Sequence, residues 1–122
     1  MYKAAEALKT FFSAFDLPAY QVGSIPEDVE LPYIAYSLNV PEWNQKATGY
    51  AQVWDRTKSN TGIIQTADQI TAAIGDTGKL ISFDGGYLAI WLETPLIQIM
   101  VDGDYRSAYI NLSINSYNMP GV

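Results

Sequence analysis

The sequence contains no cysteine and no histidine among its 122 residues. Without cysteine the chain has no disulfide bonds and no thiolate nucleophile. Without histidine it lacks the side chain that proteins use most often as a catalytic base and as a transition-metal ligand. These two absences exclude most familiar catalytic centres, so we expect a protein that is not an enzyme and that binds no cofactor.

Charged residues are also scarce. They make up 16% of the chain, against roughly 25% in an average protein. Thirteen acidic and seven basic residues give a net charge of −6, a balance that repels phosphate backbones and anionic lipid headgroups. Charge therefore disfavours nucleic-acid and membrane binding, and a surface this poor in charge predicts that part of it is an interface.

Long apolar runs are missing as well. No segment approaches the 18 or more apolar residues of a membrane-spanning helix, and residues 1–6 are amphipathic rather than signal-like. We therefore expect a protein that is made and used in a cytoplasm, without a membrane partner. A length of 122 residues fits one domain, residues 1–122, with a real core.

Periodicity predicts two helices separated by strands. Apolar residues recur at helical spacing in residues 3–15 and again in residues 60–75, where Ser59 or Asn60 is the expected N-cap and Gly75 the expected end. Strands are expected at residues 19–22, 33–38, 50–55, 79–83, 87–92, 96–101 and 108–117. This order predicts an α+β fold, with a mostly antiparallel or mixed sheet and two helices packed on one face.

The strands differ in their patterning. Residues 108–117 alternate well, which predicts one core face and one polar, aromatic face. Residues 87–92 contain no polar break, and residues 95–101 nearly none, so both faces of these strands are expected to need cover. A short chain with two helices offers little second cover. We therefore expect that cover to come from another copy or another protein, as it would in a subunit.

Three polar motifs invite a chemical interpretation, and each has a simpler one. Residues 75–79 lack the spacing and the following helix of a phosphate-binding loop, so a helix end and a turn are expected there. Residues 102–104 place two carboxylates two positions apart but are not followed by further calcium ligands, which indicates a polar turn. Glu27, Asp28 and Glu30 lie in a predicted loop without a substrate-orienting group, so we expect a solvated loop.

Aromatic residues supply the candidate interaction sites. Trp and Tyr are favoured both in cores and at the centres of interfaces. Trp43 and Tyr50 lie in and beside residues 39–49, a connection longer than a hairpin requires, and long ordered loops often carry function. Tyr109 and Tyr117 lie on the polar face of the last predicted strand. These four residues are the predicted contacts with other subunits or partners.

Six short segments resemble the tail terminator proteins of long-tailed phages, which are also described as tail completion or minor capsid proteins. The resemblance spans nearly the whole chain and consists of structural signatures without a chemical motif. The segments are Leu31-Pro32-Tyr33-Ile34-Ala35-Tyr36, Trp54, Ala67-Asp68-Gln69-Ile70, Asp84-Gly85-Gly86-Tyr87, Pro95-Leu96-Ile97-Gln98-Ile99-Met100 and Tyr109-Ile110-Asn111-Leu112.

The resemblance implies an α+β virion structural protein that forms a six-membered ring. In that family the ring caps the tail tube and joins it to the head, so the implied partners are copies of the chain, the tail tube protein and the head connector, with DNA only as passing cargo. The implied location is the head-proximal end of the virion tail, after assembly in the host cytoplasm. Many relatives carry a more arginine-rich stretch where this chain has only Asp102, Asp104 and Arg106.

Two alternatives remain open from the sequence. The chain could be a head-tail connector, a head completion protein or a tail tube protein, and a tube subunit is expected to form filaments where a terminator stops at a ring. It could instead be a small acidic binding module unrelated to virions. Whether its gene lies among capsid and tail genes distinguishes these two.

Overall fold

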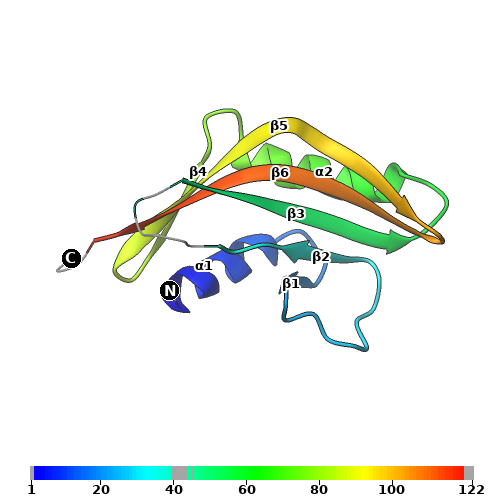
Figure 1. Ribbon diagram of the computed structural model, residues 1–122, viewed down its shortest axis with the longest axis horizontal. Coiled ribbons are helices and arrows are strands. Elements are labelled where there is room, and N and C mark those ends of the chain that lie inside the picture. Colours follow the sequence, from blue (N-terminus) through cyan, green and yellow to red (C-terminus); the bar gives the residue numbers. More distant parts are fainter. Residues whose placement is uncertain (1, 40–43, 45, 120–122) are drawn as a thin grey trace.

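The computed structural model describes residues 2–39, 44 and 46–119. Along the chain the elements are α1 (Tyr2–Phe12), β1 (Ala19–Gln21), β2 (Tyr33–Tyr36), β3 (Lys46–Arg56), α2 (Thr61–Ile74), β4 (Lys79–Phe83), β5 (Gly86–Asp102) and β6 (Tyr105–Asn118) (Figure 1). Among the described residues, no helix has the length and apolar character needed to cross a membrane.

The six strands form one sheet in the order β1-β2-β3-β6-β5-β4. The β1–β2 pair is parallel, and each of the other four neighbouring pairs is antiparallel. Both helices contribute to one hydrophobic core with the strands, and the long strands β3, β5 and β6 arch across them (Figure 1). The predicted α+β fold, with two helices on one face of a mostly antiparallel sheet, is confirmed.

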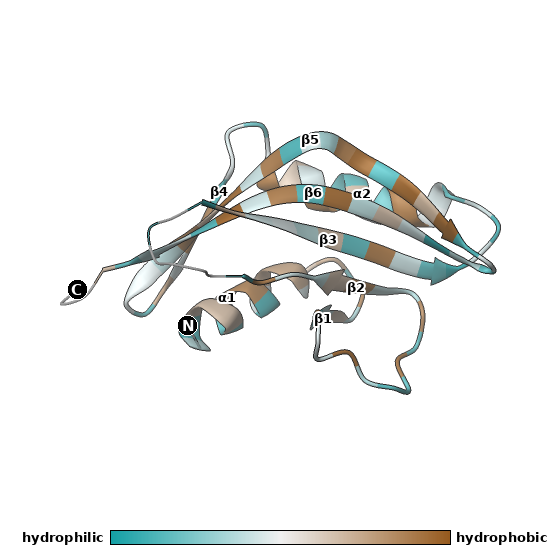
Figure 2. Ribbon diagram, in the orientation of Figure 1, coloured by the Kyte–Doolittle hydropathy of each residue, from teal (hydrophilic) through white to brown (hydrophobic). Residues whose placement is uncertain are grey.

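The core follows directly from the apolar spacing. The buried residues of α1 are Ala4, Leu8 and Phe12, four positions apart, and this spacing puts them on one stripe of the helix. The strands supply the facing side chains at every second position, and Figure 2 shows hydrophobic and hydrophilic segments alternating along the long strands. In β6 these are Ala108, Ile110, Leu112 and Ile114, all at most 3% exposed, as predicted.

The second helix begins and ends where its capping residues predict. Asn60 occupies the N-cap position and Gly75 the C-cap position, where its φ of 77° suits a residue without a side chain. The Asn60 side chain makes no capping hydrogen bond. Instead its Oδ1 accepts a hydrogen bond of 2.9 Å from Nη1 of Arg106, which links the start of α2 to β6.

The connection predicted at residues 39–49 ends earlier than expected. β3 begins at Lys46, so residues 46–49 belong to the strand and pair with β6, with Lys46 opposite Asn115 and Gly49 opposite Leu112. Pairing with a long neighbouring strand overrides the weak strand preference of Lys46 and Gly49. Trp43, one of the predicted contact residues, lies outside the described residues.

The two predicted strands at residues 87–92 and 96–101 are one strand. β5 runs from Gly86 to Asp102, and its pairing with β6 shifts register between Leu92 and Ile97. Pro95 lies inside this shift, where the missing backbone N–H costs no regular ladder bond. The proline that indicates a break in the sequence therefore marks a bulge in a continuous strand.

Candidate interaction surface on the open face of the sheet

The side of the sheet opposite the helices, here called the open face, carries polar and aromatic side chains from every long strand. In β6 it presents the alternate set Tyr109, Asn111, Ser113, Asn115 and Tyr117. The register adds Tyr50, Gln52 and Trp54 from β3 and Tyr87 and Trp91 from β5. In the part of the chain that the structure describes, neither helix packs on this face, because both contribute to the core on the other side.

Two stacked tyrosine pairs lie on the open face. Tyr50 and Tyr109 are diagonal neighbours on β3 and β6, with ring centroids 4.8 Å apart and an angle of 20° between the rings. Tyr87 and Tyr117 are directly opposite each other on β5 and β6, 4.6 Å apart at 17°. All four rings are half-buried, so each keeps one part of its surface open to a partner.

The structure therefore brings two of the predicted contact residues together and separates the third. Tyr50 and Tyr109 touch, whereas Tyr117 lies nearer the far end of the sheet beside Tyr87, which is not among the predicted contact residues. The pairing of Tyr87 with Tyr117 depends on the β5–β6 register, and no local sequence signal gives that register. Burial, and to a smaller extent the neighbouring Tyr50, raises the pKa of Tyr109 above its usual value, so this phenol stays neutral.

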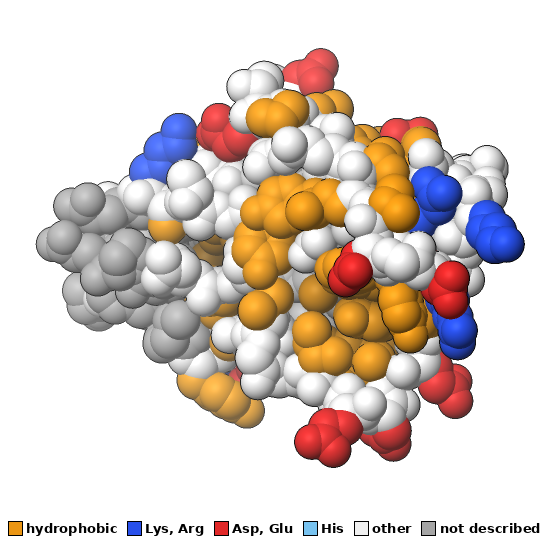
Figure 3. Space-filling view, turned by 45° about the vertical axis from the view of Figure 1, so that its right-hand side comes forward, with side chains coloured by type: hydrophobic (Ala, Val, Ile, Leu, Met, Phe, Trp, Pro, Cys, Tyr) orange, Lys and Arg blue, Asp and Glu red, His pale blue; other side chains and the backbone are white. Residues whose placement is uncertain are grey.

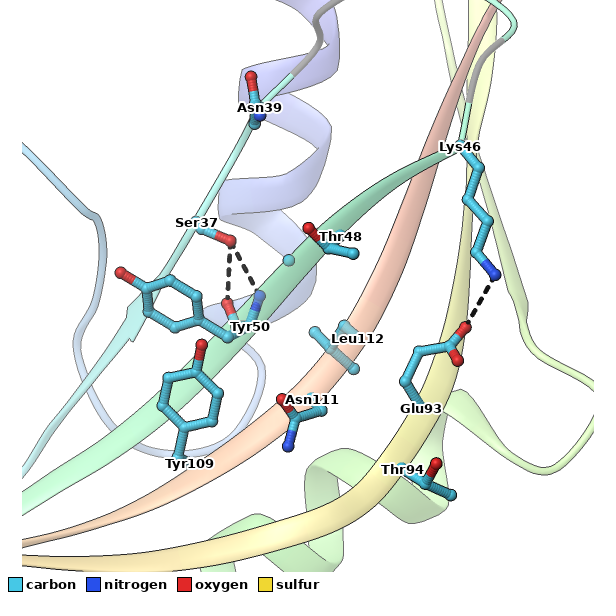
Figure 4. Close-up of a pocket in the computed structure, with 11 residues that line it drawn as sticks. Ser37, Asn39, Lys46, Thr48, Tyr50, Glu93, Thr94, Tyr109, Asn111 and Leu112 are labelled. Atoms are coloured by element: carbon cyan, nitrogen blue, oxygen red, sulfur yellow. Dashed lines mark hydrogen bonds and ion pairs between the residues drawn. The ribbon is translucent and has the colours of Figure 1, made fainter.

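A hollow of about 580 Å³ lies beside the first tyrosine pair, between the start of β3 and the bulge in β5 (Figure 4). Glu93 lines it and accepts a hydrogen bond of 2.9 Å from the hydroxyl of Ser113. The same carboxylate oxygen lies 3.3 Å from the Nζ of Lys46. The Ser113 hydrogen bond, followed by Lys46, holds the pKa of Glu93 below its usual value.

The surroundings of Glu93 do not favour general acid catalysis by this residue. A general acid needs a raised pKa, and Glu93 has a lowered one. Its carboxylate is already engaged by Ser113 and Lys46, and among the described residues no other carboxylate lines the hollow. Among the described residues, no three acidic side chains lie close enough together to bind a metal ion.

The open face is held in place by hydrogen bonds between its own side chains. The Gln52 amide donates to the Ser107 hydroxyl at 3.1 Å, and the Asn111 amide donates to Oε1 of Gln98 at 3.1 Å. Each bond joins side chains of neighbouring strands. Side chains that are already ordered lose less entropy on binding, which favours a docking surface.

No family model matches the chain, and no curated protein matches it. The resemblance to phage tail terminators therefore rests on the six segments of the sequence alone. Residues 31–36 include β2, Trp54 lies in β3, residues 67–70 lie in α2, residues 84–87 cover the β4–β5 turn and the start of β5, and residues 95–100 and 109–112 lie in β5 and β6.

A second uncovered feature is the outer edge of β5. β4 pairs only with residues 86–90 of β5, and beyond this point β5 has β6 on one side and no described strand on the other. This free part includes the exposed apolar residues Leu96, Ile99, Met100 and Val101. The expected lack of cover is therefore found at Leu96 and at residues 99–101, whereas Ile97 packs against the core and residues 88–90 are buried within the chain.

Proposed function

We propose that this chain is a structural subunit of a phage tail terminator, which closes the tail tube as a six-membered ring and provides the docking surface for the head. The observation that carries the proposal is the pair of uncovered surfaces on one small domain. The free edge of β5 offers backbone groups together with Ile99 and Val101, which project to the side of the sheet opposite the open face, so the two surfaces are different patches that meet at Met100. A ring requires such a heterologous interface, in which one patch binds a different patch of the next copy.

The free edge of β5 is the better candidate for contact between copies. An exposed apolar strand edge offers unpaired N–H and C=O groups and readily pairs with another chain. Ile99 is 36% exposed, Met100 48% and Val101 60%. Burial of such side chains in a subunit contact removes about 25 cal/mol of unfavourable hydration for each Å² covered.

The open face is the candidate surface for a second contact, with the neighbouring copy, the tail tube protein or the head connector. Tyr50 and Tyr109 form a rigid aromatic platform at its middle, and Tyr117 extends it toward the other end. Trp43 belongs to the same proposal from its sequence position. The net charge of −6 fits a channel wall along which DNA passes as cargo without adhering.

The same free edge also suits a tail tube protein, which is the second candidate. A tube subunit has to stack as well as close, so the purified chain would polymerise into filaments. A terminator stops at one ring. Electron microscopy of the purified chain at high concentration separates the two, because filaments would overturn the terminator role in favour of the tube.

The test is deletion of the gene from the phage or prophage that carries it, followed by electron microscopy of the induced lysate. The proposal predicts overlong tail tubes beside separate heads filled with DNA. Empty heads with tails of normal length would assign the chain to the head connector instead. Unaltered virions would return it to the small acidic binding modules unrelated to virions.

Complementation of that deletion tests the open face. A plasmid-borne Tyr109→Ala allele is expected to lower the infectious titre by at least about tenfold, because tyrosines at interface centres often contribute 2 kcal/mol or more. Tyr2→Ala is the matched control, since Tyr2 is 73% exposed on α1 and far from the open face in sequence and layer. Equal titres for both alleles would refute the role of Tyr109.

A further inference from the structure

An aromatic groove lies at the end of the open face where β3 ends and β6 begins. It has a volume of about 370 Å³ and combines residues of the β1–β2 connection with residues of four strands. Its lining residues are Glu27, Val29, Leu31, Tyr33, Trp54, Asp102 and Tyr105. In Figure 3, which brings this end of the molecule forward, hydrophobic side chains gather in the middle of the view, with acidic side chains around them and several basic side chains to their right.

The sheet fixes the aromatic walls of the groove. Tyr33 of β2 lies directly opposite Trp54 of β3, and Asp102 of β5 lies directly opposite Tyr105 of β6. Paired positions of neighbouring strands project to the same face, so three rings and one carboxylate are set side by side by backbone pairing. The β1–β2 connection contributes the remaining aliphatic side chains and Glu27.

The charged residues that line the groove are all acidic. They are Glu27 and Asp102, and no lysine or arginine of the described part of the chain lines it. Neither carboxylate has a hydrogen bond or ion pair with the described part of the chain, and both lie beside aromatic rings. A ring face attracts a cation, and a carboxylate adds a charge-assisted hydrogen bond. The chemistry that completes this groove is a positively charged group with an apolar stem.

The same arrangement of a cation with an aromatic ring and a carboxylate occurs within the chain, next to the groove. The guanidinium of Arg56 lies over the ring of Tyr105, 5.8 Å from its centre, and pairs with the carboxylate of Asp104 at 3.3 Å. The other arginine, Arg106, donates hydrogen bonds to the Thr57 carbonyl and to Asn60. Both arginines of the chain, Arg56 and Arg106, are thus engaged within it, so a second copy has no unengaged arginine to offer this groove.

We propose that this groove binds an arginine side chain of a different, basic protein. A planar guanidinium stacks on the indole of Trp54 and pairs with Asp102 or Glu27, which an ammonium group does less well because it is compact and strongly hydrated. Val29 and Leu31 cover the methylene stem of the arginine. This inference goes beyond the proposed function and rests on the groove alone.

The test is titration of the full chain with the peptide acetyl-Gly-Gly-Arg-Gly-Gly-amide, followed by NMR of the tryptophan indole N–H signals. The Trp54 signal is assigned from a W54F variant. We expect this signal to shift with saturation and a Kd on the order of 1 mM, as suits one anchored side chain. The same peptide with citrulline, the neutral isostere of arginine, should shift it by less than a tenth as much.

Two variants separate a local site from general attraction to an acidic protein. D102N removes a groove carboxylate and should weaken binding at least fivefold. D84N makes the same change in net charge in the β4–β5 turn, where asparagine fits equally well, and should leave the Kd within twofold. An equal shift with citrulline, equal losses in both variants, or no saturable shift at all would each overturn the proposal.

Discussion

Replacement of Gly86 by alanine should be the most damaging methyl addition in the sheet. Gly86 begins β5 and pairs with Asn118 of β6. An added Cβ there would lie 2.0 Å from the carbonyl oxygen of Tyr117 and 2.8 Å from the ring of Phe83. Contacts below 3.0 Å are essentially never seen for a real Cβ, so the β6 backbone has to move by about 1 Å and the adjacent ladder bonds weaken.

The cost follows from these contacts. Overpacking of this kind costs about 1–3 kcal/mol, and one or two strained ladder hydrogen bonds add about 1 kcal/mol each. We therefore expect Gly86→Ala to lower the free energy of unfolding by about 3 kcal/mol. For 122 residues the unfolding entropy is about 0.26 kcal/mol/K, so the melting temperature should fall by about 12 °C.

The assay is thermal unfolding followed by circular dichroism, with Gly62→Ala as the matched control. Gly62 lies in α2, and an added Cβ would meet nothing within 4 Å. Alanine there should raise stability by about 0.5 kcal/mol, because it restricts the unfolded chain and favours the helix. Opposite signs for the two variants are predicted. A Gly86→Ala melting temperature within 3 °C of the parent would refute the register of β5 against β6.

Two further predictions use charged side chains. Arg106→Met should lower the free energy of unfolding, measured in urea, by about 2 kcal/mol, because it removes two charge-assisted hydrogen bonds to the segment before α2. Arg56→Met breaks only an exposed ion pair and should lower it by less than about 1 kcal/mol. Equal losses for the two variants would contradict the structure. Glu93→Gln should be less stable than the parent at pH 7. Because Ser113 and Lys46 lower the pKa of Glu93 in the folded state, its ionised form stabilises the fold above the unfolded pKa. The difference in free energy of unfolding between parent and variant should therefore close as the pH falls below about 4.3. A difference that does not change with pH would refute this.

Local periodicity was sufficient for the two helices, the core face of the last strand and the fold class. The spacing of Ala4, Leu8 and Phe12 gives α1, and the alternation from Ala108 to Ile114 gives the core face of β6. Both patterns are set by neighbours within a few residues, so the sequence displays them directly. The glycine at position 75 likewise marks the end of α2 because only the local backbone conformation is involved.

Features that depend on strands distant in the sequence were not predictable in this way. The extension of β3 to Lys46 depends on the partner residues near Asn115, and the union of two predicted strands into β5 depends on continued pairing with β6 across Pro95. The candidate site shows the same limit. Tyr109 and Tyr117 could be placed on the polar face of β6 by alternation, whereas the stacking of Tyr87 on Tyr117 required the register.

The most direct test of the proposed tail terminator role is cryo-electron microscopy of the neck of a phage particle whose genome encodes this chain. The proposed role predicts a closed ring of density between the tail tube and the head, with six copies that each fit the six-stranded sheet and its two helices. The edge of β5 should lie at a contact between copies, with the open face against a neighbouring protein. Density for this chain elsewhere in the particle, or a ring in which both surfaces face solvent, would contradict it.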